Sequence, residues 1–250
     1  MRSDDLEPVS PALRERLAPG GTLRAGINLS NFLLVSARTP DGGPAGVSPD
    51  MARAIADRLG VALRYVPYAS PALLADAAMR GEWDIGLIGA EPQRAETIAF
   101  TPAYAAIEAT YLVPAGSSLT SVADVDAPGV RIAVTAKTAY GLWLDRNISR
   151  AELIRTATMD ETLVDFRDRK LDALAGLRAR LISDVAQLPG ARILDGRFMT
   201  VQQAIGIARN GAPATDEAVA WLTRFVESAK TSGLVAELIA SHGVEGLSVA

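Results

Sequence analysis

The chain alternates between short apolar runs and segments in which apolar residues recur every three or four positions. Runs that predict strands lie at 22–27, 61–66, 85–88 and 130–134. Met51, Ile55 and Leu59 form a helical stripe, and Gly60 ends it. Strands that alternate with helices indicate a parallel sheet with crossover helices, which binds ligands at the carboxyl ends of its strands. The pattern therefore predicts an α/β fold with its site at that edge.

Polar residues predict where several helices begin. Ser48, with Pro49 at the first helical position, is expected to cap one helix, and Thr138 another. Asp160 and Glu161 are expected to cap a third.

The strand–helix pattern restarts after Pro114, which predicts two lobes. The expected division is a polar N-terminal leader at 1–21, lobe 1 at 22–107 plus 204–250, and lobe 2 at 108–203. Each lobe is expected to hold its own mainly parallel sheet flanked by helices. Two hinge crossings, near 106–113 and 200–205, are expected to join them.

Composition excludes several classes of function. The 250 residues carry a net charge of −4, so the chain lacks the positive charge of a nucleic-acid-binding protein. The chain has no cysteine, which excludes disulfides and thiolate chemistry. The single histidine, His242, is expected to be a solvated helix-end residue, so neither a serine-hydrolase triad nor a metal centre is predicted. No cofactor is expected, and no apolar run is long enough to cross a bilayer.

A strand that ends in glycine with an arginine beside it is the most informative stretch. Residues 85–88 lead through Gly89-Ala90-Glu91-Pro92 to Arg94, so that backbone N–H groups and a guanidinium converge, as a carboxylate requires. The stretch resembles the Gly-x-x-Asp, Arg and Phe-Ser/Thr-x-x-Tyr signature of the family 3 extracellular solute-binding proteins. These are receptors of ABC transporters with the two-lobed type II periplasmic-binding fold. The matching residues are Gly81, Asp84, Arg94, Phe100, Thr101, Pro102 and Tyr104.

The resemblance implies a cleft between the lobes that closes on a ligand by hinge motion. In lobe 1 it implies ligand contacts from Gly89, Ala90, Glu91 and Arg94. The family places an aromatic residue in the loop after the first strand, where this chain has Asn31. A turn-forming role and a ligand contact are both open for Asn31. Gln202 or Gln203 is expected near the hinge and facing the cleft, and Gln203 is the candidate ligand contact.

In lobe 2 the resemblance implies an anion site at a helix start. Lys137, Thr138 and Ala139 match the family's Gly-Thr/Ser segment, with Lys137 in place of the glycine. A lysine beside a helix N-terminus adds a second attraction for an anion. An ordinary capped helix without a ligand is the alternative.

Leu177 marks a departure from the family. Receptors for α-amino acids carry a carboxylate there, five residues after Asp172, and it binds the ligand's ammonium group. Leucine cannot pair with an ammonium. An α-amino acid must therefore use another carboxylate, such as Glu91, or the ligand is an organic acid. The next residue, Arg178, is read either as a ligand contact or as a solvated helix residue.

These expectations combine into a monomeric solute-binding protein for a small carboxylate-bearing ligand, with an ABC transporter permease as its partner. The added Lys137 and the missing carboxylate at Leu177 favour an organic acid over a basic amino acid. A cyclohexadienyl (arogenate or prephenate) dehydratase on the same fold is the alternative, with Glu91 or Glu108 as the acid. A cytoplasmic ligand-sensing protein is a third reading. Residues 1–21 lack the apolar core of a signal peptide, so the sequence as written predicts a cytoplasmic location, or a periplasmic one if a signal has been trimmed.

Overall fold

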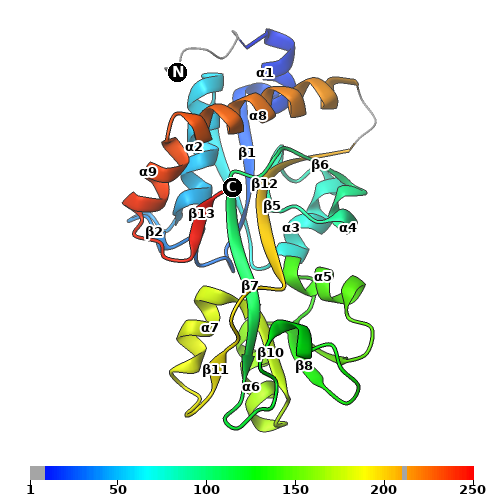
Figure 1. Cartoon of the computed structure of the whole chain (residues 1–250). Coiled ribbons are helices and arrows are strands. Elements are labelled where there is room, and N and C mark those ends of the chain that lie inside the picture. The colour runs from blue at the N-terminus through cyan, green and yellow to red at the C-terminus, as the bar shows by residue number, and fades with distance from the viewer. Residues whose placement is uncertain (1–8, 210–212) are drawn as a thin grey trace. The chain divides into compact units, whose positions relative to one another are not determined.

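The computed structural model describes residues 9–209 and 213–250, which divide into two compact units (Figure 1). Unit 1 comprises the described residues up to Ala106 and from Gln202 onward, and unit 2 comprises Ile107–Val201. The chain passes between the units inside two strands, β7 (Ala105–Val113) and β12 (Met199–Ala208). In the described residues, no helix has the length and apolar character needed to cross a membrane.

The sheet of unit 1 has the strand order β4-β1-β5-β12. Its strands are β1 (Thr22–Asn28), β4 (Ala62–Tyr68), β5 (Ile85–Gly89) and β12, with β6 (Ile98–Phe100) beside β12, β13 (Leu247–Val249) beside β7, and a separate hairpin of β2 (Ala37–Arg38) and β3 (Pro44–Ala45). The strand β1 runs parallel to both β4 and β5, and β12 pairs antiparallel with β5. The carboxyl ends of β1 and β5 therefore lie at one edge of the sheet.

Helices pack around this sheet, and α2 and α3 both contact β1 (Figure 1). The helices of unit 1 are α1 (Pro11–Leu17), α2 (Val47–Leu59), α3 (Pro71–Ala77), α4 (Pro92–Ala95), α8 (Pro213–Thr231) and α9 (Leu234–Ser241), with short 3-10 turns η1 (Pro19–Gly21) and η2 (Ala78–Arg80). Residues of the expected polar leader thus form α1 and η1, and Leu13 and Leu17 of α1 are buried. Met51, Ile55 and Leu59 bury the predicted stripe of α2, and Gly60 closes that helix in a left-handed conformation.

The start of α2 differs from the prediction. The helix begins at Val47 after Gly46, so Ser48 lies inside its first turn and does not cap it. The hydroxyl of Ser48 instead lies 2.9 Å from that of Tyr104, which is fully buried. Tyr104 belongs to the family signature, and this contact gives it a structural role. A sequence pattern identifies Ser48 as a good capping residue, but it cannot show that the hydroxyl will hydrogen-bond to a tyrosine 56 positions away.

We expect the Ser48→Ala variant to lower the free energy of unfolding by about 1–3 kcal/mol, because the buried hydroxyl of Tyr104 loses its partner. Adding Tyr104→Phe removes the second polar group as well, so the double variant should be less destabilised than the sum of the two single variants. Urea denaturation of the three variants measures this coupling. Strictly additive losses would contradict it.

His242 is not the solvated residue that was expected. It ends α9, and its Nε2 lies 2.6 Å from Oδ2 of Asp50 in the first turn of α2. The two helices contact each other, and the hydrogen bond fixes the end of one against the start of the other. His242 therefore has a structural partner within unit 1.

Unit 2 repeats the α/β arrangement. Its strands are β7, β8 (Arg131–Thr135), β9 (Glu152–Thr156), β10 (Ala173–Leu177) and β11 (Arg192–Ile193), and its helices are α5 (Ala139–Asn147), α6 (Met159–Asp168) and α7 (Arg178–Val185), with the 3-10 turn η3 (Val122–Asp124). The strand β8 runs parallel to both β10 and β9, while β7 pairs antiparallel with β10. A core that includes Leu112, Leu163 and Phe166 packs α6 on this sheet.

The cap of α6 also differs from the prediction. Thr158 is the N-cap, and its hydroxyl accepts from the N–H of Glu161, while the Glu161 carboxylate accepts from the N–H of Thr158. Glu161 therefore takes part in the cap as the second half of a capping box. Asp160 does not take part, and its side chain is directed elsewhere.

The same ion-pair arrangement ties neighbouring parallel strands in both units. Asp84, just before β5, accepts from the backbone N–H and the guanidinium of Arg24 on β1, and Arg24 also donates to the carbonyl of Gly81. In unit 2, Asp172 accepts in the same way from Arg131 on β8. The signature residue Asp84 thus serves to align two strands at their amino ends.

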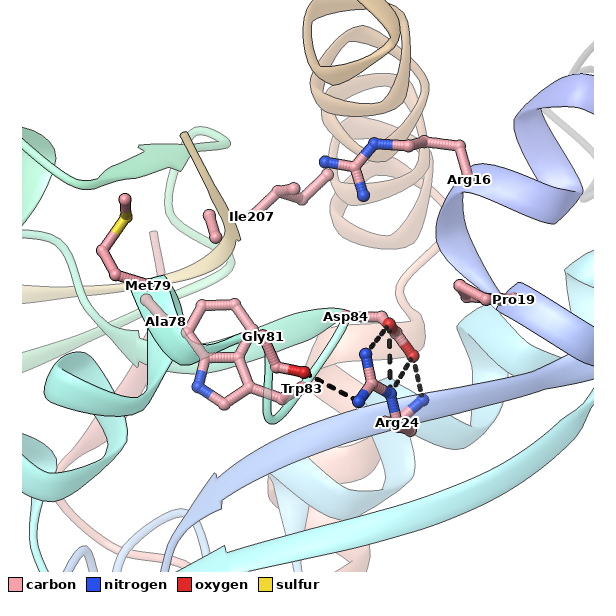
Figure 2. A pocket seen from close by; sticks show the side chains of 10 residues that line it. Arg16, Pro19, Arg24, Ala78, Met79, Gly81, Trp83, Asp84 and Ile207 are labelled. Carbon is pink, nitrogen blue, oxygen red and sulfur yellow. Dashed lines mark hydrogen bonds and ion pairs between the residues drawn. The ribbon is translucent and has the colours of Figure 1, made fainter. Parts of the chain in front are cut away.

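Figure 2 shows the Arg24–Asp84 pair in the wall of a pocket of about 220 Å³ that Trp83 and Met79 also line. Asp84 precedes the first residue of β5, so this pocket lies toward the amino ends of the strands. The predicted ligand residues follow the carboxyl ends. The pocket is therefore separate from the candidate site.

The strands form one hydrogen-bonded path, β4-β1-β5-β12-β7-β10-β8-β9. Two separate sheets were expected. The difference arises because β7 and β12 are long strands that contribute residues to both units and pair with each other. The predicted mainly parallel α/β character holds in both units.

Candidate ligand-binding site

The structure brings the predicted residues of unit 1 to one edge of its sheet. Ile27 near the end of β1 lies opposite Leu87 of β5, and Gly89 at the end of β5 lies opposite Gln203 of β12. The loops that follow the two parallel strands therefore start side by side. The residues placed there are Asn31, Gly89, Ala90, Glu91, Arg94 and Gln203.

Arg94 has the properties of an anion-binding group. Its side chain is buried, and Nη1 donates to the carbonyl of Gly89 at 2.7 Å. Burial lowers the pKa of Arg94 to about 10, and the nearby charge of Glu91 opposes that shift. A guanidinium that has lost its hydration gains strongly from a carboxylate partner, with which it can form a two-pronged hydrogen bond. Arg94 thus suits the predicted role of a carboxylate anchor.

The backbone donors beside Arg94 differ from the prediction in one respect. The N–H of Ala90 donates to the carbonyl of Gln202 at 2.7 Å, and Ala90 is therefore unsuited to the role of ligand donor. Glu91 is the N-cap residue of α4 and is buried. The N–H of Ala90 is used by the pairing of β12 with β5, whereas the sequence alone predicted that it would bind the ligand.

Asn31 has the turn-forming role that was one of its two readings. Its Oδ1 accepts from the N–H of Leu33, and its carbonyl accepts from the N–H groups of Leu34 and Val35. The neighbouring residue, Phe32, was missed in the sequence. Its side chain is 37% exposed in the same loop, so it offers an aromatic surface at this edge. The family pattern of an aromatic in this loop was the signal, displaced by one position.

In unit 2 the predicted residues also gather at the carboxyl ends of parallel strands. Thr138 caps α5, since its hydroxyl accepts from the N–H of Gly141 and donates to the carbonyl of Thr135. Lys137 adopts a left-handed backbone conformation with φ of 56°, which makes the sharp turn from β8 into α5. Ala139 is the first residue of that helix. The helix start is therefore built as predicted.

Leu177 and Arg178 mark the junction of β10 and α7. Leu177 is buried and ends the strand, and α7 begins directly at Arg178. Arg178 donates to Glu108 at 2.9 Å and to the carbonyl of Gly196, and Arg197 donates to the other oxygen of Glu108. Arg178 thus has a structural partner that neither of its two readings included.

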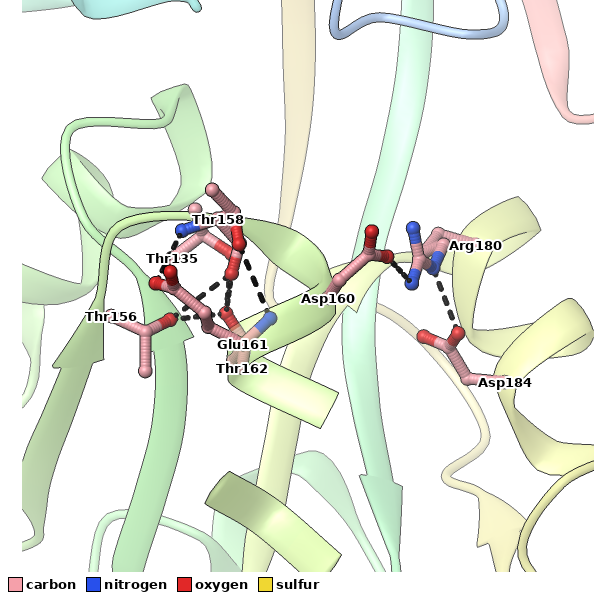
Figure 3. A network of polar contacts seen from close by, with 8 residues as sticks. All are labelled: Thr135, Thr156, Thr158, Asp160, Glu161, Thr162, Arg180 and Asp184. Carbon is pink, nitrogen blue, oxygen red and sulfur yellow. Dashed lines mark hydrogen bonds and ion pairs between the residues drawn. The ribbon is translucent and has the colours of Figure 1, made fainter. Parts of the chain in front are cut away.

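Threonine hydroxyl groups of β8, β9 and α6 lie close together at this edge of unit 2 (Figure 3). Thr162 on α6 lies 2.7 Å from the hydroxyl of Thr135 and 2.6 Å from that of Thr156, and it donates to the carbonyl of Thr158. These contacts join the ends of β8 and β9 to α6. Burial raises the pKa of Tyr140, which lies against the hydroxyl groups of Thr135 and Thr138. The edge of unit 2 is therefore polar, and hydrogen bonds join its elements.

Among the residues that the structure describes, no group of His, Asp and Glu side chains is arranged to hold a metal ion.

The sequence from residue 23 to residue 245 matches the model of the bacterial extracellular solute-binding proteins, family 3. The chain belongs to this family. The comparison with curated proteins found no match. The predicted family and the predicted two-lobed α/β fold class are both confirmed.

Solved structures of similar fold include binding proteins of ABC transporters with bound amino acids. A putative binding component of an ABC transporter from Wolinella succinogenes, complexed with lysine, is 21% identical, with a TM-score of 0.72 and coverage of 89% of this chain and 95% of that chain. The amino-acid receptor AbpA from Streptococcus pneumoniae, bound to L-arginine, is 19% identical, with a TM-score of 0.69 and coverage of 90% and 97%.

A third structure is an ancestral amino acid-binding protein described as a precursor of cyclohexadienyl dehydratase. It is 23% identical to this chain, with a TM-score of 0.67 and coverage of 88% of this chain and 95% of that chain. At these identities the likenesses establish the fold and leave the ligand to be argued from this chain's own residues.

Proposed function

We propose that this family 3 solute-binding protein captures a small carboxylate-bearing solute and delivers it to an ABC transporter. The buried guanidinium of Arg94 at the edge of unit 1 carries the proposal. It would hold the ligand carboxylate through charge-assisted hydrogen bonds. Gln203 and Phe32 would contribute a polar and an aromatic contact.

We infer that the protein binds without catalysing a reaction. A dehydratase needs a carboxylic acid that can donate a proton. Glu108 accepts hydrogen bonds from Arg178 and Arg197 on its two oxygens, so both are occupied by cations. Glu91 is buried, and its charge acts against the burial that lowers the pKa of Arg94, so it favours the charged guanidinium. Neither carboxylate is arranged as an acid for a leaving hydroxyl.

Three measurements test this function. Titration calorimetry with α-amino acids and organic acids should show one-to-one binding of carboxylate compounds, and mass spectrometry of the purified protein should detect a co-purified acid. Incubation with prephenate or arogenate should leave both compounds unchanged. Turnover that is lost in Glu91→Gln or Glu108→Gln would establish the dehydratase instead.

A further inference from the structure

The pocket beside the Arg24–Asp84 pair lies entirely within unit 1, toward the amino ends of its strands (Figure 2). Its walls come from α1, η1, β1, η2 and β12 and from the turn before β5. The pocket has a volume of about 220 Å³, and a cavity of about 150 Å³ already admits benzene. It can therefore hold a compact molecule that consists of one ring and a small substituent.

One side of the pocket is apolar and fixed in shape. The ring of Trp83 is buried, and its Nε1 donates to the carbonyl of Leu74 at 3.0 Å, so its polar group is used within the protein. The ring lies against Gly26 and Gly86, which pair across β1 and β5, and a Cβ at either glycine would come within 3.1 Å of it. The other apolar residues on this side are Ala78, Met79 and Ile207 (Figure 2). This side suits the hydrocarbon part of a ligand.

Arg24 supplies hydrogen-bond donors on another side. It uses Nε and Nη2 for Asp84 and Nη1 for the carbonyl of Gly81. A guanidinium has five N–H groups, so these contacts with the described residues leave one N–H on each terminal nitrogen. The side chain of Arg24 is 31% exposed, whereas that of Asp84 is 4% exposed. The ion pair therefore holds Arg24 in place and presents donors to a ligand.

Arg16 adds a second guanidinium to the wall. Its helix, α1, contacts α8 and buries Leu13 and Leu17. Nη2 of Arg16 donates to the hydroxyl of Thr215 on α8 at 3.2 Å, and Figure 2 shows the guanidinium reaching from α1 toward the pocket. Among the described residues that line the pocket, the charged ones are two arginines and one aspartate. The wall therefore favours an anion.

Part of this wall lies outside the region that identifies the family. The family match begins at residue 23, whereas Arg16 and Pro19 precede it. The matched region alone would lack one of the two arginines. The pocket is therefore not a feature that the family signature implies.

We propose that this pocket binds a compact carboxylate whose apolar body is about the size of a benzene ring. The carboxylate accepts from Arg24 and is attracted by the charge of Arg16. The apolar body packs on Trp83 and is covered by Met79, whose flexible side chain is 60% exposed. The site is separate from the one around Arg94 and does not depend on the proposed function.

Two simpler occupants match the walls less well. An inorganic anion would leave the apolar side around Trp83 without a contact. A neutral hydrocarbon would cover the remaining N–H groups of Arg24 without accepting from them, which costs free energy. A carboxylate with an apolar body satisfies both sides.

Calorimetry with benzoate, benzamide and acetate tests the two halves of the site. Benzamide keeps the ring and loses the charge, and acetate keeps the charge and loses the ring. Benzoate should bind at least about tenfold more tightly than either compound, because each half of the molecule has its own contacts. Absence of benzoate binding, or equal affinity for benzoate and one of the other compounds, would overturn the inference.

A charge placed at Met79 tests where benzoate binds. Met79→Glu puts a like charge beside the carboxylate and should weaken benzoate binding by about tenfold. Leu73→Glu makes a similar change at another exposed apolar residue of unit 1, outside the residues that line the pocket, and should leave the affinity unchanged. Both positions are at least half exposed, so both variants should fold. Equal loss of affinity in the two variants would contradict the proposed location.

Arg16→Gln tests the wall that precedes the matched region. It should weaken benzoate binding by about tenfold, since it removes one of the two cations. Arg14→Gln, at an exposed position of the same helix, is the matched control and should have no effect. The melting temperature of each variant is measured beside its affinity.

Arg94→Ala separates this inference from the proposed function. Benzoate affinity that falls with Met79→Glu but not with Arg94→Ala supports the pocket described here. Benzoate affinity that falls with Arg94→Ala but not with Met79→Glu places benzoate at the candidate ligand-binding site. In that case the inference is wrong and the proposed function stands.

Discussion

Replacing Arg94 with alanine is expected to weaken the binding of carboxylate ligands by at least about tenfold. A hydrogen bond to a charged group contributes roughly 1.5–3 kcal/mol, and about 1.4 kcal/mol corresponds to a factor of ten. The buried position of Arg94 strengthens the effect, because water cannot replace the lost guanidinium as a partner for the carboxylate. Calorimetry with the tightest-binding compound of the ligand series measures the loss.

Two further variants make this result specific. Arg94→Lys keeps the charge but loses the planar fork, so its affinity should lie between those of the unaltered protein and Arg94→Ala. Arg80→Ala removes an exposed arginine of the same unit that pairs with Glu82, and it should leave the affinity unchanged. Because Arg94 also donates to Gly89, the melting temperature of each variant is measured beside its affinity. If the Arg94→Ala variant stays folded and binds the ligand with unchanged affinity, Arg94 does not contact the ligand.

The second large effect concerns stability. We expect Asp84→Ala to lower the free energy of unfolding by about 3 kcal/mol, because the buried carboxylate makes several hydrogen bonds to Arg24, and one that involves a charged group contributes roughly 1.5–3 kcal/mol. The carboxylate of Asp84 is 4% exposed, and it accepts from both the backbone N–H and the guanidinium of Arg24. For a chain of this size, such a loss should lower the melting temperature of the unit by about 6–12 °C. Calorimetric melting measures it.

Asp172→Ala is the matched control in unit 2. It removes the same arrangement with Arg131, but there both side chains are about 40% exposed. An exposed ion pair contributes about 1 kcal/mol or less, so the loss should be clearly smaller than that of Asp84→Ala. Neither aspartate lies at a carboxyl strand end, so ligand affinity measured below the melting transition should stay the same. Equal destabilisation by the two variants would show that burial does not set the size of the effect.

Much of the local structure could be predicted from the sequence, because it depends on residues close together in the chain. The stripe of α2 with Gly60 at its end, the cap Thr138 and the strand β5 are examples, since helical periodicity, capping and flanking glycines act within a few positions. The signature through Arg94 and Tyr104 was sufficient to predict the family. In a pattern of alternating strands and helices, these features also fix which edge of the sheet holds Arg94.

What each polar group contacts was decided only by the tertiary structure, because the partners lie far apart in the chain. Ser48 resembles a cap until Tyr104 is placed beside it, and the N–H of Ala90 resembles a ligand donor until β12 pairs with β5. Asp84 is only a match to the family signature in the sequence, and its partner Arg24 is brought to it by the pairing of β1 with β5.

The charge of the unit 2 edge shows the same limit most clearly. The sequence by itself determined that Leu177 lacks the carboxylate of the family pattern. It could not determine that the first turn of α6 would bring Asp160 to Arg180, beside the start of α7. A single position in a motif shows which side chain is missing, but the net charge of an edge is the sum over every element that packs there. Only the folded arrangement of β8, β9 and β10 brings those elements together.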